Sequence, residues 1–259
     1  MKQLIYTEWL KVKNYRTFWI MLLLAVGVIA AGNYVVVNVV IGQLGKASQM
    51  VGQGPVSFPY VWQTVANVSS YISSLFGLLL VILVTNEYTF RTHRQNIIDG
   101  WERKQFVYAK LFWVVALSVL ALVVVTIIAA IVGLMYGNSS FTTDGFVYLF
   151  YYFLQVLLTL CLALLLSVLV KRAGFAIVLF LGYTMMLEQT MVFILKKNWG
   201  RIGGLMPLQT GDELLPFPVI GNLISMGDRY DDNVYLMMLL VYIVLVVFFV
   251  FRRVLRSDL

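Results

Sequence analysis

Residues 111–136 read LFWVVALSVLALVVVTIIAAIVGLMY, and residues 146–170 read FVYLFYYFLQVLLTLCLALLLSVLV. Neither stretch contains Asp, Glu, Lys or Arg. Each is longer than the roughly 20 apolar residues that a helix needs to cross the hydrocarbon core of a bilayer. The two stretches therefore predict transmembrane helices, and the expected fold class is an all-α polytopic membrane protein.

The composition of the whole chain supports the same class. Of the 259 residues, 61% are hydrophobic and 12% are charged, whereas soluble domains carry about 45–50% apolar and roughly 25% charged residues. A water-soluble fold of this size could not bury so much apolar surface. We therefore expect residues 1–259 to form a single transmembrane domain in the cell membrane, and in a bacterial inner membrane in particular.

Six apolar stretches are long enough, or nearly so, to span the bilayer as helices. They are Phe18–Ile41, Val65–Thr85, Leu111–Tyr136, Phe146–Val170, Gly174–Leu195 and Val234–Phe251. The first follows a polar, aromatic leader and lacks a clear small-residue cleavage site, so we expect it to be a span and not a cleaved signal peptide.

The positions of Lys and Arg orient these spans, because cytoplasmic loops are enriched in both residues. Fourteen of the 19 basic residues lie in the leader, in the loops after the second and fourth spans, and in the C-terminal tail. The long loop between spans five and six holds more acids than bases. This alternation predicts that both termini are cytoplasmic.

Several classes of function lack the residues that they require. Cys161 is the only cysteine and His93 the only histidine, which excludes an internal disulfide and any metal site built on several Cys or His ligands. The basic residues flank apolar runs and form no single patch, so we expect no nucleic-acid partner. The sequence contains no Walker A, HExxH or GxSxG motif, so we predict no catalytic residue and no cofactor in this chain.

The leader is predicted to form an amphipathic helix at the membrane surface. Ile5, Trp9 and Val12 recur at helical spacing, and the lysines of the leader supply its charged side. Aromatic rings prefer the headgroup layer, which favours a helix lying in that layer. The alternative is that the leader only provides positive charge to orient the first span.

The loop between spans two and three is the most informative part of the chain. Residues 86–110 read NEYTFRTHRQNIIDGWERKQFVYAK, which is far more than a connection between two spans requires. Residues 87–99 are predicted to form a short helix that carries Ile97 and Ile98, and Gly100 can end it. Such a short, charged element just below the bilayer is suited to docking a cytoplasmic partner.

The start of the third span has a capping signal of its own. Asp99 is followed three residues later by Glu102, which is the spacing of a capping box at a helix N-terminus. A solvated, positively charged loop would explain the charges here but neither the caps nor the apolar pair. Both interpretations of the loop remain open on these residues alone.

These features together resemble the membrane subunits of type-2 ATP-binding-cassette transporters. That family has an elbow helix, six spans, and a coupling helix whose loop shows Glu, Gly-Thr, a short apolar stretch, Pro-x-Ser-Arg and a Lys. The matching residues are Glu87, Thr92, Ile97, Ile98, Arg103 and Lys110. The chain departs from the pattern at Arg91, where Gly is usual, and at Gly100-Trp101-Glu102, where Pro and Ser are usual.

The resemblance implies a mechanism and a set of partners. A separate cytoplasmic ATPase, which binds ATP and Mg²⁺, would receive the loop in a groove. We assign this coupling to Glu87, Thr92, Ile97, Ile98, Trp101 and Arg103. The family also implies export and a dimer with a second copy or a paralogue. Two alternatives remain: a membrane enzyme or assembly factor, and a secondary transporter, which would usually carry more ionisable groups at mid-membrane and an internal repeat.

A few polar residues lie within the predicted spans. Glu188 is the only acidic or basic residue well inside one, and such residues by default indicate function. Thr184 lies one turn earlier, and Asn67, Ser70 and Ser74 share one face of the second span. Because the resembled family lines its pathway with spans two and five, we predict that these five residues face the pathway. Alternatively, the hydroxyls only bridge helices, at about 0.6 kcal/mol per contact.

The segment Lys196–Asn233, between spans five and six, alternates Gly and Pro with apolar residues. Exposed to water, that apolar content would be a liability. We predict two short re-entrant or interfacial helices that bury it against the spans, as the resembled family has here. An ordinary folded loop is the alternative.

Overall fold

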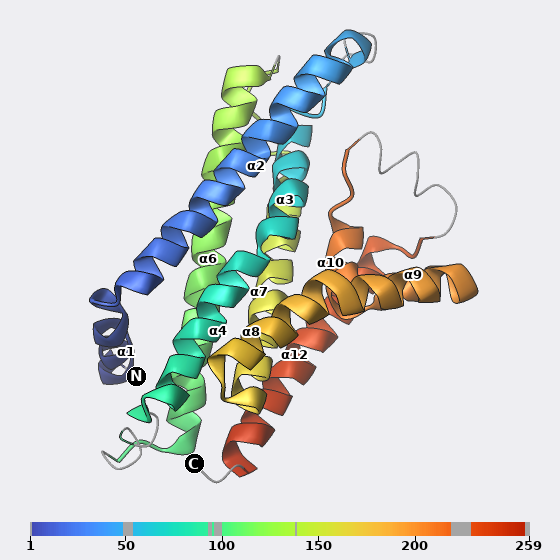
Figure 1. Cartoon of the computed structure of the whole chain (residues 1–259). Helices are drawn as coiled ribbons and strands as arrows, with labels where there is room; N and C mark the ends of the chain where they lie inside the picture. Colours follow the sequence, from blue (N-terminus) through green and yellow to red (C-terminus); the bar gives the residue numbers. More distant parts are fainter. Residues whose placement is uncertain are drawn as a thin grey trace.

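The computed structural model describes residues 2–48, 54–92, 95, 100–137, 139–218 and 229–256 (Figure 1). The helices are α1 (Lys2–Lys13), α2 (Arg16–Ser48), α3 (Tyr60–Ile72), α4 (Ser74–Thr89), α6 (Arg103–Tyr136), α7 (Phe146–Val170), α8 (Ala173–Gly182), the π-helix η1 (Tyr183–Leu187), α9 (Glu188–Trp199), the 3₁₀-helix η2 (Gly200–Leu205), α10 (Pro207–Leu214) and α12 (Asp232–Arg256). No strand occurs in these ranges, so the all-α prediction is confirmed.

The candidate membrane spans follow the predicted ones. Within the described ranges five helices are long and apolar enough to cross a bilayer: α2, α6, α7, the run from α8 through η2, and α12. The bent pair α3–α4 makes a sixth if it counts as one span. Both termini lie at the same end of the bundle (Figure 1), as an even number of spans requires. The polytopic architecture is thus confirmed.

Helix α7 forms the centre of the bundle. It contacts α3, α4, α6, α8, α10 and α12. In its apolar stretch 67% of the residues are buried within the chain, against 17–33% in the other unbroken spans. A helix that is apolar all round is expected in such a central position. The exposed apolar faces of the surrounding helices are therefore left to lipid or to a partner chain.

The second span was predicted as one helix, but it bends by 41° between α3 and α4. The Ser70 hydroxyl donates to the carbonyl of Asn67 at 2.7 Å, and the Ser73 hydroxyl donates to the carbonyl of Ser70 at 2.6 Å. Serine hydroxyls that bond back to their own helix compete with its backbone ladder and often bend it. Ser70, from the predicted polar face, and Ser73 thus lie at the bend with their hydroxyls bonded to their own backbone.

The loop after α4 differs from the predicted short helix. Residues 87–89 belong to α4, and Arg91 then takes a left-handed backbone conformation with φ of 56°. The predicted start at Glu87 is therefore wrong, because the second span extends further than expected. Ile97 and Ile98 lie outside the described residues.

The predicted capping box is also displaced. The N-cap of α6 is Glu102, and its backbone N–H donates to the side-chain oxygen Oε1 of Gln105 at 3.2 Å. Asp99, the predicted cap, lies outside the described residues. Gly100, with φ of 96°, occupies a left-handed position that favours glycine. The helix of the third span thus begins three residues later than the sequence indicated.

Short helices occupy the segment between spans five and six, as predicted. In its described part, η2 and α10 follow α9, and α10 packs against α7 and α12. Residues 219–228, which include the apolar Ile220 and Ile224, lie outside the described ranges. The depth of these helices in the bilayer stays a prediction.

The packing of α4 on α8 yields a first testable expectation. A Cβ added at Gly77 would overlap the ring of Phe180, whereas one added at Gly182 would meet nothing within 4 Å. We expect Gly77→Ala to destabilise the chain by about 1–3 kcal/mol, as overpacking does. Denaturation in detergent would measure this change.

The control for this prediction is Gly182→Ala at the end of α8, two residues after Phe180, which should cost nothing and can stabilise by removing a flexible glycine. In a Phe180→Ala background, the cost of Gly77→Ala should disappear because the ring is gone. Equal stability of the two single alanine variants would contradict the close α4–α8 contact.

Candidate functional site

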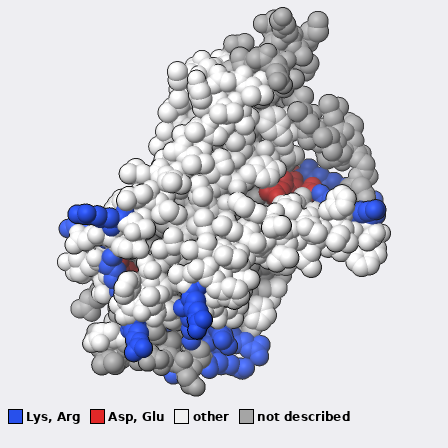
Figure 2. Space-filling model, in the orientation of Figure 1, with Lys and Arg blue, Asp and Glu red and all other residues white. Residues whose placement is uncertain are grey.

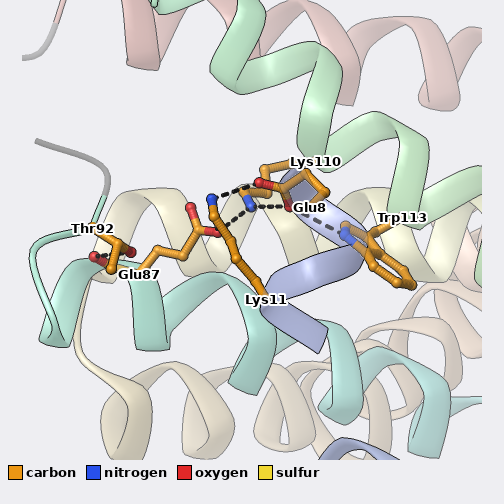
Figure 3. A network of polar contacts seen from close by, with 6 residues as sticks. All are labelled: Glu8, Lys11, Glu87, Thr92, Lys110 and Trp113. Carbon is orange, nitrogen blue, oxygen red and sulfur yellow. Dashed lines mark hydrogen bonds and ion pairs between the residues drawn. The ribbon is translucent and has the colours of Figure 1, made fainter. Parts of the chain in front are cut away.

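Four charged side chains meet at the end of the bundle that carries the termini. The Lys110 Nζ atom lies 2.7 Å from Glu8 Oε2 and 2.6 Å from Glu87 Oε1 (Figure 3). Lys11 Nζ lies 2.7 Å from Glu8 Oε1 and 3.0 Å from Glu87 Oε1. The indole N–H of Trp113 also donates to Glu8 Oε2 at 3.1 Å. We call Glu8, Lys11, Glu87 and Lys110 the ionic cluster.

The ionic cluster is held by three elements far apart in sequence. Glu8 and Lys11 come from α1, Glu87 from the last turn of α4, and Lys110 from the third turn of α6. Leu4, Glu8 and Val12 are buried, at spacings of four residues along one face of α1. The carboxylate of Glu8 therefore stands within the stripe that packs α1 against the bundle.

The predicted apolar face of the leader is placed differently. The leader is helical, as expected, but Ile5 and Trp9 are 37% and 43% exposed whereas Val12 is 3% exposed. The three predicted residues therefore do not share one environment. Ile5 and Trp9 face outward, where a lipid headgroup layer would meet them, and Val12 joins the core.

Electrostatics favour the charged form of Glu8 in spite of its burial. Burial raises the pKa of Glu8, but the charges of Lys110 and Lys11 outweigh it and hold that pKa below its ordinary value. Lys110 is 1% exposed, as is the side chain of Glu8. Two carboxylates and two ammonium groups balance, which avoids the cost of an uncompensated buried charge.

The predicted coupling residues that the structure describes divide into two groups. Thr92 donates its hydroxyl to the backbone carbonyl of Glu87 at 3.4 Å, and Lys11 Nζ lies 5.6 Å from the centre of the Trp101 ring. Arg103 instead donates to the carbonyl of Leu255 in α12 at 3.1 Å. Glu87, Thr92 and Trp101 are thus connected to the leader, and Arg103 to the C-terminal helix.

Sequence reasoning missed Glu8 as a member of the site. Lys110 was matched to the family motif, and Lys11 was assigned only to the charged side of the leader. The available signal was an acid at the centre of the apolar spacing Leu4, Glu8, Val12, where a leader helix should carry another apolar residue.

A second group of polar residues lines a cavity deeper in the bundle. Of the five predicted pathway residues, Ser70, Ser74 and Thr184 line this cavity. Asn67 is buried beside it and donates its side-chain amide to the carbonyl of Leu215 at 2.5 Å. The structure thus brings spans two and five together at these residues.

Glu188, the last of the five predicted pathway residues, is fully buried and accepts hydrogen bonds from the N-terminus of α10. Its Oε1 atom accepts from the backbone N–H groups of Leu208 and of Gln209, the latter at 3.1 Å. The N-cap of α10 is Met206, which has no side-chain oxygen to serve this purpose. A distant carboxylate therefore caps the helix, and its charge also suits the positive end of the helix dipole.

Charged side chains on the surface gather in two places. Figure 2 shows Lys and Arg gathered toward the end with the termini, and a mixed group of acidic and basic side chains beside α10. The latter includes Glu213, whose Oε1 atom lies 2.5 Å from Lys196 Nζ, and Arg229, which bonds the carbonyl of Glu213 at 2.5 Å. This group holds α9, α10 and the approach to α12 together.

Comparison with known proteins adds one positive finding. The family model described as ABC-2 family transporter protein matches residues 4–194, from the first turn of α1 into α9. The match covers the ionic cluster, the loop after α4 and the first five candidate spans. No curated protein matches the chain.

Proposed function

The chain belongs to the ABC-2 family of transporter proteins, and we propose that it is the permease subunit of an exporter driven by a separate cytoplasmic ATPase. In this proposal the ATPase binds ATP and Mg²⁺, and the present chain supplies the membrane pathway. Export rests on the resemblance described above. The multi-pass architecture places the chain in a membrane, and we propose the bacterial inner membrane.

The observation that best supports coupling to an ATPase is the ionic cluster. Glu87 and Lys110 flank the loop between α4 and α6, and Lys110 Nζ lies 2.6 Å from Glu87 Oε1. Glu8 ties the leader to the same point. A loop whose two ends are joined by buried ion pairs should move as a unit with spans two and three. Force applied to the loop by a partner would therefore reach the spans instead of being lost in the loop.

We further propose that two such chains form the pathway, either as a homodimer or with a paralogue. Many large apolar side chains on the described part of span five are exposed, among them Met186, Phe193 and Trp199. Apolar exposure alone would suit lipid equally well. The dimer therefore rests on the family resemblance, in which six spans make half of a pathway.

The experiment that tests this function is affinity purification of the tagged chain from native membranes in mild detergent. We expect an ATPase with a Walker A motif to accompany the chain, identified by mass spectrometry and by ATP hydrolysis in the eluate. Changing Ile97, Ile98 and Trp101 to Asp should remove that ATPase, because charges on the loop would prevent it from entering an apolar groove.

A matched control places new carboxylates at the opposite end of the bundle. Ser140 and Thr143 are exposed in the α6–α7 connection, and Ser140→Asp with Thr143→Asp should leave the ATPase bound. Absence of any ATPase from the intact chain, even after crosslinking, would overturn the proposal. A membrane enzyme or assembly factor would then become the better interpretation.

A further inference from the structure

The cavity between spans two, four and five is lined mostly by polar side chains. Its lining residues that the proposal uses are Ser70, Ser73, Gln155, Thr159, Thr184 and Asp212. They come from the α3–α4 bend, α7, η1 and α10. The volume is about 80 Å³, several times the roughly 10–15 Å³ that one water needs. The cavity can therefore hold a small chemical group and not only a single water molecule.

Four of the hydroxyl groups that line this cavity already use their protons. Those of Ser70, Ser73, Thr159 and Thr184 donate to backbone carbonyls three or four residues earlier, at 2.6–3.0 Å. A hydroxyl has one proton to donate but two lone pairs to accept with. With the proton engaged, each hydroxyl can offer a ligand only an acceptor.

The side-chain oxygen of Gln155 is a further acceptor. Its side-chain N–H₂ donates to Asp212 Oδ1 at 2.7 Å, which fixes the orientation of the amide. Gln155 is 4% exposed, and its Oε1 atom has no hydrogen-bond partner among the described residues. Gly211 packs against the same side chain, since an added Cβ would lie 2.5 Å from Gln155 Cγ. A buried acceptor without a donor in the described chain can accept a hydrogen bond from a ligand in the cavity.

The charge around the cavity selects a cation. Asp212 is the acid in the lining, and Glu188 and Glu213 lie close enough to act on it, as does Lys196. Lys196 is engaged by Glu213 at 2.5 Å, and Asp212 forms no ion pair with the residues that the structure describes. Burial accordingly raises the pKa of Asp212 to about 7. An anionic ligand would face the carboxyl group of Asp212 and the lone pairs of the engaged hydroxyls, which disfavours an anion relative to a cation.

We propose that this cavity binds the primary ammonium group of an amphiphilic ligand, with its N–H groups donating to Asp212, Gln155 and the lining hydroxyls. Met185 and Leu208 also line the cavity and suit the carbon chain next to the nitrogen. A divalent metal ion would favour several carboxylates, whereas Asp212 is the acid in this lining. As the substrate class of an exporter this inference rests on the proposed function, but ligand binding itself does not.

The test compares two amphiphiles of equal charge and chain length on the purified chain in lipid nanodiscs. Octylamine carries three N–H donors, and octyltrimethylammonium carries none. We expect octylamine to bind at least about tenfold more tightly, because charge-assisted hydrogen bonds are lost with the methylated headgroup. Calorimetric titration with the intact chain would give both dissociation constants, with empty nanodiscs subtracted. Equal affinities would overturn the proposal.

Variants provide an independent test. Asp212→Asn should weaken octylamine binding about tenfold or more by removing the charge, while Asp144→Asn, an exposed acid in the α6–α7 connection, should leave it unchanged. If Asp212→Asn does not fold, Thr184→Val removes one acceptor with little change in shape and should weaken binding by a few fold. Octylamine affinity that is the same in every folded variant would overturn the site.

The amine could come from a membrane lipid or from a separate molecule. Nanodiscs that contain phosphatidylethanolamine should reduce the apparent octylamine affinity if the lipid headgroup occupies the cavity, and should leave it unchanged if the ligand is a free amine. Either result supports an ammonium site and assigns its source. Because no ATPase is present in this assay, failure of partner recovery and failure of amine binding are distinguishable.

Discussion

Replacing Lys110 with methionine is expected to lower the free energy of unfolding by about 3–5 kcal/mol, the range seen when one partner of a buried ion pair is removed. Lys110 is 1% exposed and is bonded to both Glu8 and Glu87. The variant leaves two buried carboxylates beside Lys11, whose side chain is 26% exposed. Denaturation in detergent, together with the yield of folded chain, would measure the loss.

Two controls separate the ionic cluster from a general effect of the substitution. Lys104→Met changes an exposed lysine of the same helix and should be nearly neutral. Adding Glu8→Gln to Lys110→Met leaves one carboxylate, Glu87, opposite one ammonium group, Lys11, and should recover much of the stability. A Lys110→Met chain as stable as the Lys104→Met chain would show that the cluster contributes nothing to folding.

The pH dependence of the same variant has a defined sign. Lysines hold the pKa of Glu8 below its ordinary value, so the ion-paired carboxylate stabilises the folded chain at neutral pH. That contribution is lost as pH falls through the lowered pKa, when Glu8 takes up a proton. The difference between the parent chain and Lys110→Met should therefore shrink in acid.

The spans were predictable from sequence because each one needs a continuous apolar segment long enough to cross the bilayer, and such a segment can be recognised without knowledge of the rest of the fold. The predicted fourth span, Phe146–Val170, has the bounds of α7 in the structure. The bend in the second span was not predicted, because the apolar run continues through it. At the bend the hydroxyls of Ser70 and Ser73 bond to their own backbone, and the sequence leaves open whether such a serine bends its helix.

The ionic cluster could be predicted only in part. Glu87 and Lys110 match a family motif, but Glu8 lies 102 residues from Lys110 in a leader whose charges are ordinarily solvated. A contact at that separation depends on how α1 folds back onto the bundle, which no local pattern encodes. That four hydroxyls of the inner cavity serve only as acceptors is likewise a property of hydrogen-bond direction, which residue types alone leave undetermined.

The sequence and the structure indicate different roles for Glu188. Its position inside a span predicts a role in the pathway, whereas its carboxylate caps α10 through the N–H groups of Leu208 and Gln209. We expect Glu188→Ala to cost about 2–4 kcal/mol, because it leaves two buried donors unpaired. Glu188→Gln keeps an oxygen acceptor and should cost about half as much or less. Thr190→Ala, an exposed neighbour in α9, is the control.

Hydrogen exchange of the α10 amides decides between the two roles. In Glu188→Ala the amides of Leu208 and Gln209 should exchange faster, while in Glu188→Gln they should stay protected. If the residue only caps the helix, a transport assay should find Glu188→Gln active. If the charge also serves the pathway, Glu188→Gln should lose transport with α10 still protected. Unchanged exchange in Glu188→Ala would contradict the cap, and the carboxylate would then be free for the pathway role that its position indicates.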